Sequence, residues 1–213
     1  MDRVKTNSEC RSNRELFQLF QQPRVEVPSF DIYRRVGNLF AQLFYRYVCE
    51  KEYTLDGLLN GAVQAAYLCG RYISEGSWKR LGAIMEEDSL EEVRERVETM
   101  TPEEISNIKF ADDDVICSFL HLCCFGGHSF FGPLKPKNYS FITHVVIYVR
   151  KDPSISVDES PKKLIKNPAV GSLHVINITL SRSINPLGFW KIIKLNFFDP
   201  AGRPDIADVA LIR

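Results

Sequence analysis

The clearest hydrophobic pattern in the chain lies between residues 50 and 81. At about 100° per residue, one face of this stretch is apolar and the opposite face is polar. The apolar positions are Leu55, Leu58, Leu59, Ala62, Ala66, Cys69 and Ile73. Thr54 is suited to cap the start of a helix and Gly76 to end it. We therefore predict a helix from residue 55 to about residue 75, whose narrow alanine and cysteine stripe packs closely on a sheet.

A second amphipathic helix is predicted from Asp31 to about Cys49. Its apolar face carries Ile32, Val36, Leu39, Phe40, Leu43, Phe44 and Tyr47, and its other face carries Arg34, Arg35, Asn38, Gln42 and Arg46. We expect the arginine face to point outward into solvent. Contact of Arg34, Arg35 and Arg46 with lipid headgroups, RNA or a protein partner is the alternative.

Further helices are predicted downstream of these two. They cover Trp78 to Met85, a segment from a capping box at Ser89 to about Met100, and a short turn after Thr101 with Pro102 at its first position.

From residue 108 onward the hydrophobic period changes to two, which is typical of strands. Candidate strands are Ile108–Phe110, Val115–Phe125, Ser140–Arg150, Ser172–Ser181, Phe189–Phe198 and Ile206–Ile212. Turns are expected at residues 112–114, 185–188 and 199–202, and long surface loops at 126–138 and 151–171. Helices followed by an antiparallel meander predict an α+β fold in which the sheet curls around the helices.

Composition and charge narrow the class of protein. The 213 residues are 45% hydrophobic, enough for one full core, and Lys+Arg and Asp+Glu both total 27. A neutral chain gives no support for wrapping DNA. Six cysteines without CxxC pairs suggest reduced thiols in a reducing compartment. We divide the chain into a flexible N-terminal extension, 1–30, which resembles a targeting segment, and a single domain, 31–213.

Histidines, cysteines and acids offer several candidate sites. His121, Cys123, Cys124 and His128 have the chemistry of zinc ligands, but alternation along a strand separates them. A Cys/His nucleophile pair there would need a stabilised thiolate, which apolar surroundings oppose. Asp112, Asp113 and Asp114 fit a turn better than a cation site. His144 and His174 could meet Asp199 or Asp205 as acid and base.

Motifs for phosphate, dinucleotide, metalloprotease or hydrolase chemistry are missing from the sequence. We predict no catalytic residues, no cofactor and no metal.

Residues 36–100 resemble a mitochondrial domain family. The likeness rests on Glu50–Tyr53 leading into a helix with Gly61, Ala62, Ala65, Ala66 and Tyr67, and resumes weakly at residues 204–212. The family contains the import-motor anchor of the inner-membrane translocase, a mitochondrial large-ribosomal-subunit protein and the matrix AAA peptidase-interacting protein, the member that this chain resembles most. The resemblance implies a cone-shaped fold related to the nuclear-transport-factor-two-like domains.

The resemblance also implies a function. It points to a non-enzymatic protein of the mitochondrial matrix, peripheral to the inner membrane, that binds the matrix AAA protease or its inner-membrane client proteins and assists their sorting or biogenesis. Association with the mitochondrial large ribosomal subunit is one alternative. A small-ligand carrier or enzyme with a pocket is another.

Overall fold

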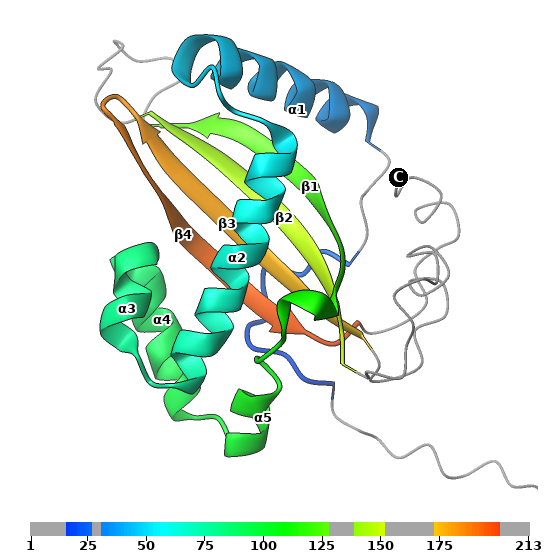
Figure 1. Cartoon of the computed structure of the whole chain (residues 1–213), viewed down its shortest axis with the longest axis vertical. Helices are drawn as coiled ribbons and strands as arrows, with labels where there is room; N and C mark the ends of the chain where they lie inside the picture. Colours follow the sequence, from blue (N-terminus) through cyan, green and yellow to red (C-terminus); the bar gives the residue numbers. More distant parts are fainter. Residues whose placement is uncertain (1–15, 27–30, 128–138, 152–172, 201–213) are drawn as a thin grey trace, which may run out of the picture.

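The computed structural model describes residues 16–26, 31–127, 139–151 and 173–200, and in these ranges helices precede a four-stranded antiparallel sheet (Figure 1). The helical elements are α1 (Ile32–Phe44), the π-helical turn η1 (Tyr45–Cys49), α2 (Leu55–Ser74), α3 (Trp78–Ile84), α4 (Glu87–Glu98), α5 (Pro102–Ser106) and the 3₁₀ turn η2 (Asp112–Asp114). The strands are β1 (Val115–Gly126), β2 (Ser140–Arg150), β3 (Leu173–Ile184) and β4 (Leu187–Phe198). The sheet is open, with the order β1-β2-β3-β4. The α+β class predicted from the sequence is confirmed.

Most helix boundaries follow the expected capping residues. The Thr54 side chain accepts a hydrogen bond from the Gly57 N–H at 3.1 Å, and Gly76 adopts the left-handed φ of 64° that suits a glycine after a helix. Thr101 forms the predicted capping box before α5. The box predicted at Ser89 is wrong, because α4 already begins at Glu87 and the Ser89 hydroxyl donates to a carbonyl of β4 instead.

The predicted strands at 115–125, 140–150, 172–181 and 189–198 match β1 to β4. Ile108–Phe110 is not a strand: Ile108 is fully buried in the turn after α5. Residues 112–114 form the expected turn, η2, whose Asp114 carboxylate accepts from the Ala111 N–H. Residues 206–212 and most of the two long loops lie outside the described ranges.

The core lies between α2 and one face of the sheet, which we call the inner face (Figure 1). Ala62, Ala66 and Cys69 of α2 are fully buried, as the small-residue stripe predicted. The chain after α5 lies close to the backbone of α2: a Cβ added at Gly70 would lie 2.7 Å from the Ile108 carbonyl oxygen. At the end of the core near α1, Tyr45 stacks on Phe141 with ring centroids 4.1 Å apart.

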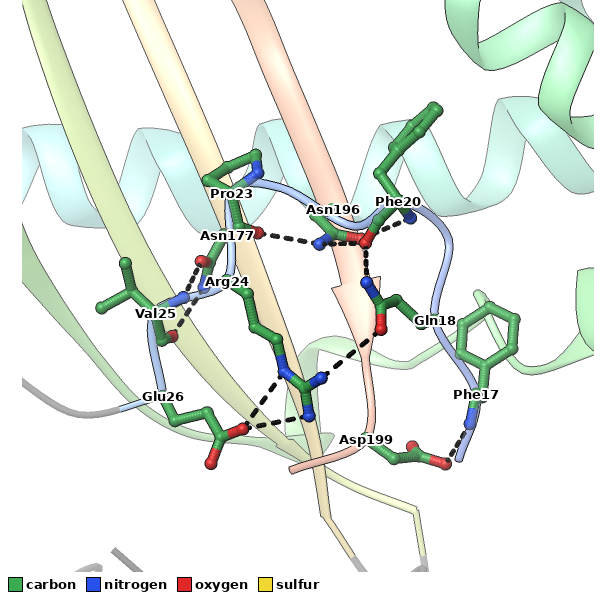
Figure 2. Close-up of polar contacts among 10 residues, drawn as sticks. All are labelled: Phe17, Gln18, Phe20, Pro23, Arg24, Val25, Glu26, Asn177, Asn196 and Asp199. Atoms are coloured by element: carbon green, nitrogen blue, oxygen red, sulfur yellow. Dashed lines mark hydrogen bonds and ion pairs between the residues drawn. The ribbon is translucent and has the colours of Figure 1, made fainter. Parts of the chain in front are cut away.

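Part of the predicted flexible extension belongs to the fold, so the domain boundary expected at residue 30 is wrong. Residues 16–26 form the N-terminal strap, which pairs with the end of β4 around Gln18, bends at residues 19–22 and then crosses β3 on the outer face of the sheet (Figure 2). The Leu19 N–H donates to the Phe197 carbonyl at 2.8 Å, and the Asp199 N–H donates to the Phe17 carbonyl at 2.9 Å. Phe17 and Leu19 alternate with Gln18 and are buried, which is the period of a strand.

Candidate functional site

The most unusual surface of the protein is the apolar face of α1 and η1, which points away from the core. Nine large apolar side chains there are exposed: Ile32, Tyr33, Val36, Leu39, Phe40, Leu43, Phe44, Tyr47 and Val48. Tyr33 is 90% exposed, Phe40 67% and Tyr47 74%. We call this set the α1 apolar face. Soluble proteins rarely leave so many neighbouring apolar side chains in water, and such patches mark protein or membrane contacts.

The polar side of α1 faces the sheet, and Asn38 makes the central contact. The Cys123 N–H donates to Asn38 Oδ1 at 2.9 Å, and Asn38 Nδ2 donates to the His121 carbonyl at 3.1 Å. β1 is an edge strand, so these main-chain groups have no strand partner on that side. The amide of Asn38 satisfies them as a neighbouring strand would, and Asn38 is buried in doing so. The expectation of an outward polar face is therefore wrong for the centre of α1.

The three predicted arginines divide between two environments. Arg34 is half-buried, and its Nη1 lies 3.0 Å from Nε2 of His121 on β1. Arg35 and Arg46 are exposed beside the α1 apolar face. Sequence reasoning found these arginines but missed Asn38, because an asparagine among arginines carries no sign of burial.

An apolar groove runs between α1 and the adjacent ends of the strands. It has a volume of about 860 Å³, and its wall includes Phe40, Phe44 and Val48 from α1 and η1, Leu122 and Phe125 from β1, and Ile184 from β3. Phe44 and Phe125 meet edge to face, with ring centroids 5.2 Å apart. Three members of the α1 apolar face thus also line the groove, so groove and face form one continuous apolar surface.

Charge is distributed unevenly along the molecule although the whole chain is neutral. Residues 32–49 contain three arginines and no acidic residue. Residues 86–104, which cover α4 and the start of α5, contain nine acidic residues and two arginines. α1 lies at one end of the long axis, and α3, α4 and α5 lie at the other (Figure 1). The α1 segment is therefore basic and apolar, and the α4 segment is acidic.

The residues with the chemistry of zinc ligands, for which no metal site was predicted from the sequence, are engaged in other contacts. Cys123 donates from its thiol to the Asn38 carbonyl, whereas His121 contacts Arg34 and packs edge-on against His144. No group of three His, Cys, Asp or Glu side chains among the described residues is arranged to hold a metal ion, and His128 lies outside them. Burial raises the pKa of the Cys123 thiol to about 12, which opposes a nucleophilic thiolate.

His174 and Asp199 lie in contact, and this is one of the acid–base pairs that the sequence suggested. His174 Nδ1 lies 2.9 Å from Asp199 Oδ1, and Lys151 Nζ lies 2.7 Å from the same oxygen. Burial lowers the pKa of His174, and its ring stacks on Phe17. His174 lines neither the groove beside α1 nor the smaller cavities around α2. In this setting the pair of His174 and Asp199 holds the end of β4 to the strap. Asp205, the other predicted partner, lies outside the described residues.

His144 is the second buried histidine within a strand. Its Nδ1 lies 2.8 Å from the Thr179 hydroxyl, and its Nε2 is buried without a hydrogen-bond partner among the described residues. Burial, reinforced by the neighbouring His121, lowers the pKa of His144 to about 4. The ring is therefore neutral at physiological pH and belongs to the packing of the sheet.

The Asn38 contact predicts a specific loss of stability. In Asn38→Ala, the Cys123 N–H and the His121 carbonyl lose their partner, which should lower the free energy of unfolding by about 2 to 3 kcal/mol in urea titrations. Gln42→Ala is the matched control, because the hydrogen bond that the Gln42 amide makes among the described residues goes to the Asn38 carbonyl within the same helix. This control should cost less than about 0.5 kcal/mol. Equal losses in the two variants would show that the edge-strand contact is not what holds α1.

The buried His144 predicts a loss of stability in acid. Its folded-state pKa lies below the unfolded value of 6.5, so its contribution is complete above pH 6.5 and is lost as the pH falls toward 4. The full loss is on the order of 3 kcal/mol at 1.36 kcal/mol per pKa unit. His144→Gln should flatten the pH dependence of urea unfolding between pH 6.5 and 4 relative to the wild type. Parallel curves for the two proteins would contradict this assignment.

Among the described residues, no helix combines the length and the apolarity that a bilayer crossing requires. No protein-family model, curated protein or solved structure matches this chain.

Proposed function

We propose that the protein is a non-enzymatic peripheral membrane protein that lays α1 on an anionic bilayer surface. The observation that carries the proposal is the α1 apolar face, nine exposed apolar side chains on an 18-residue helical segment without acidic residues. Interfacial helices combine such a face with arginines that meet lipid phosphates. The membrane is the mitochondrial inner membrane and the protein binds its matrix side, as the family resemblance implies.

The energy available from α1 is large enough for peripheral binding. Burying an apolar side chain of this size is worth about 1.5 to 3 kcal/mol, so nine half-exposed side chains offer on the order of 10 kcal/mol. A basic residue near an anionic surface adds about 1 kcal/mol. The apolar groove beside α1 opens on the same surface and would face the acyl region.

The charge distribution favours one orientation. The basic α1 end is attracted to anionic lipid, and the acidic α4 end is repelled from it. Both effects turn the α1 apolar face toward the bilayer. A ribosomal RNA surface would also attract the arginines, but it offers no apolar area for the nine exposed side chains. A membrane therefore explains both the arginines and the exposed apolar side chains, whereas RNA explains only the arginines.

The protein partner and the finer fold assignment rest on the resemblance. We propose a matrix AAA protease, itself membrane-embedded, as the partner, with sorting or biogenesis of inner-membrane proteins as the shared task. The fold is proposed to be a cone-shaped variant of the nuclear-transport-factor-two-like domains, supported by helices that precede an antiparallel sheet with α2 across it. Proximity labelling in mitochondria should recover the protease, and recovery of cytosolic neighbours alone would refute the partner and the location.

Co-sedimentation with vesicles tests the membrane proposal. The wild-type protein should bind vesicles that contain cardiolipin, bind neutral phosphatidylcholine vesicles weakly, and bind less as salt rises. Leu39→Asp places a charge in the α1 apolar face and should reduce binding at least about tenfold, because it costs over 1.4 kcal/mol. Arg46→Gln should weaken binding to anionic vesicles about fivefold, the equivalent of one lost basic contact.

Phe189→Asp is the matched control for the apolar substitution. Phe189 is 91% exposed but lies on β4, outside α1, so the same charge introduced there should leave vesicle binding unchanged. Circular dichroism would verify that all variants fold. Equal binding by Leu39→Asp and the wild type would refute the membrane role of α1 and leave a protein partner as the occupant of this surface.

A further inference from the structure

β4 forms one edge of the sheet, and the fold covers part of that edge with other segments. The strap bonds the main chain of Phe197 and Asp199, and the Glu86 N–H after α3 donates to the Ile192 carbonyl at 2.9 Å. α3 and α4 lie beside this covered part of β4 (Figure 1). Residues 187–191 receive no main-chain hydrogen bond on this side from the described residues, so one stretch of the edge is open.

The main-chain groups of Trp190 point out of the open edge. Groups two residues apart along a strand point to the same side, and those of Ile192 point to the edge, where its carbonyl meets Glu86. The register between them is regular, because Trp190, Lys191 and Ile192 pair with consecutive residues of β3. Trp190 therefore offers an N–H and a C=O to an incoming strand.

Two cavities lie beside Trp190 on the inner face of the sheet, between β4 and α2. The first, the apolar cavity, has a volume of about 260 Å³ and a wall that includes Ile84 and Ile192. The second, the acidic cavity, has a volume of about 200 Å³ and is bordered by Glu50 and Glu52. Trp190 lines both, so the cavities are neighbours along the open edge. A strand added to β4 would point alternate side chains toward them, about 7 Å apart.

Each cavity favours a different kind of side chain. Glu50 is already paired with Arg182 at 2.7 Å, whereas Glu52 is exposed and makes no ion pair with the described residues. A basic side chain therefore complements the acidic cavity, and an aliphatic one complements the apolar cavity. α2 leaves room for both, because it borders the cavities with Gly57 and Gly61, and a Cβ added at Gly61 would meet nothing within 4 Å.

We propose that the open edge of β4 is a strand-addition site for an extended segment of another protein, with an aliphatic residue followed two positions later by a basic residue. In an antiparallel pair, one residue of the segment exchanges both main-chain bonds with Trp190. The aliphatic side chain opposite Trp190 enters the apolar cavity, which lies on the Ile192 side, and the basic side chain reaches the acidic cavity. Main-chain bonds supply affinity and the cavities supply selectivity. The proposal does not depend on the membrane role of α1.

Titration with a designed peptide tests the site. In full-length protein carrying Trp78→Phe, Trp190 is the remaining tryptophan, so its emission reports binding directly. The peptide acetyl-Ser-Thr-Leu-Thr-Arg-Thr-Ser-amide should shift that emission in a saturable way. N-methylation of its leucine removes the N–H that donates to the Trp190 carbonyl and should weaken binding at least about tenfold. No binding of the unmodified peptide at millimolar concentration, or equal binding of the two peptides, would overturn the proposal.

Substitutions in the protein test the two cavities separately. Gly61→Leu fills the apolar cavity from α2 and should weaken peptide binding at least about tenfold, whereas Gly37→Leu, at an equally open helical glycine on α1, should leave it unchanged. Glu52→Arg should weaken binding of the arginine peptide about fivefold and strengthen binding of a peptide with glutamate in its place. Circular dichroism verifies that the variants fold.

Two outcomes would contradict the assignment of the cavities or of the occupant. Wild-type affinities of Glu52→Arg and Gly61→Leu for the peptides would show that neither cavity receives a side chain. Wild-type protein that self-associates in light scattering and dissociates when the peptide is added would identify a second copy of this chain, and not another protein, as the occupant.

Discussion

The pairing of asparagine side chains with main-chain groups is the interaction on which the arrangement of this protein depends. A carboxamide carries a donor and an acceptor in one plane, as a peptide group does, so a single side chain can replace a neighbouring strand. Asn38 does this for the edge of β1, and Asn177 and Asn196 do it for the strap over β3 and β4. All three amides are buried, where an unpaired polar group is costly, so each fixes the segment that it holds.

The Asn38 contact explains why α1 turns its apolar side outward. A helix presents only one side to a neighbour, and the hydrogen bonds of Asn38 and Arg34 commit the polar side of α1 to β1. The opposite side, with Leu39 and Tyr47, must then face away from the protein. An exposed apolar face is thus a consequence of polar docking, and it is stable in the absence of a partner because the polar groups beneath it are satisfied.

Local patterns in the sequence predicted the elements well but not every packing relation. Thr54, Gly76 and Thr101 act through the residues next to them, and the boundaries of α2 and α5 were predictable for that reason. The direction in which the apolar face of α1 points was not predictable. An amphipathic pattern defines an apolar face and a polar face, but it does not establish that the apolar face packs on the core. The pairing of the strap with the sheet was not predicted, because the alternation of Phe17 and Leu19 covers too few residues to indicate a strand. The nearby arginines made the same segment resemble a targeting peptide.

The manner in which α1 is anchored bears on how it could meet a membrane. Asn38 holds its middle, and Glu50, just after η1, accepts from Arg182 at 2.7 Å and from the Tyr45 hydroxyl at 3.2 Å. These contacts lie on the protein side of the helix and use none of the exposed apolar side chains. Insertion of those side chains into lipid would break none of these hydrogen bonds, so binding would need no release of α1. A surface that is organised before it binds loses little entropy on binding, and more of its apolar energy remains as affinity.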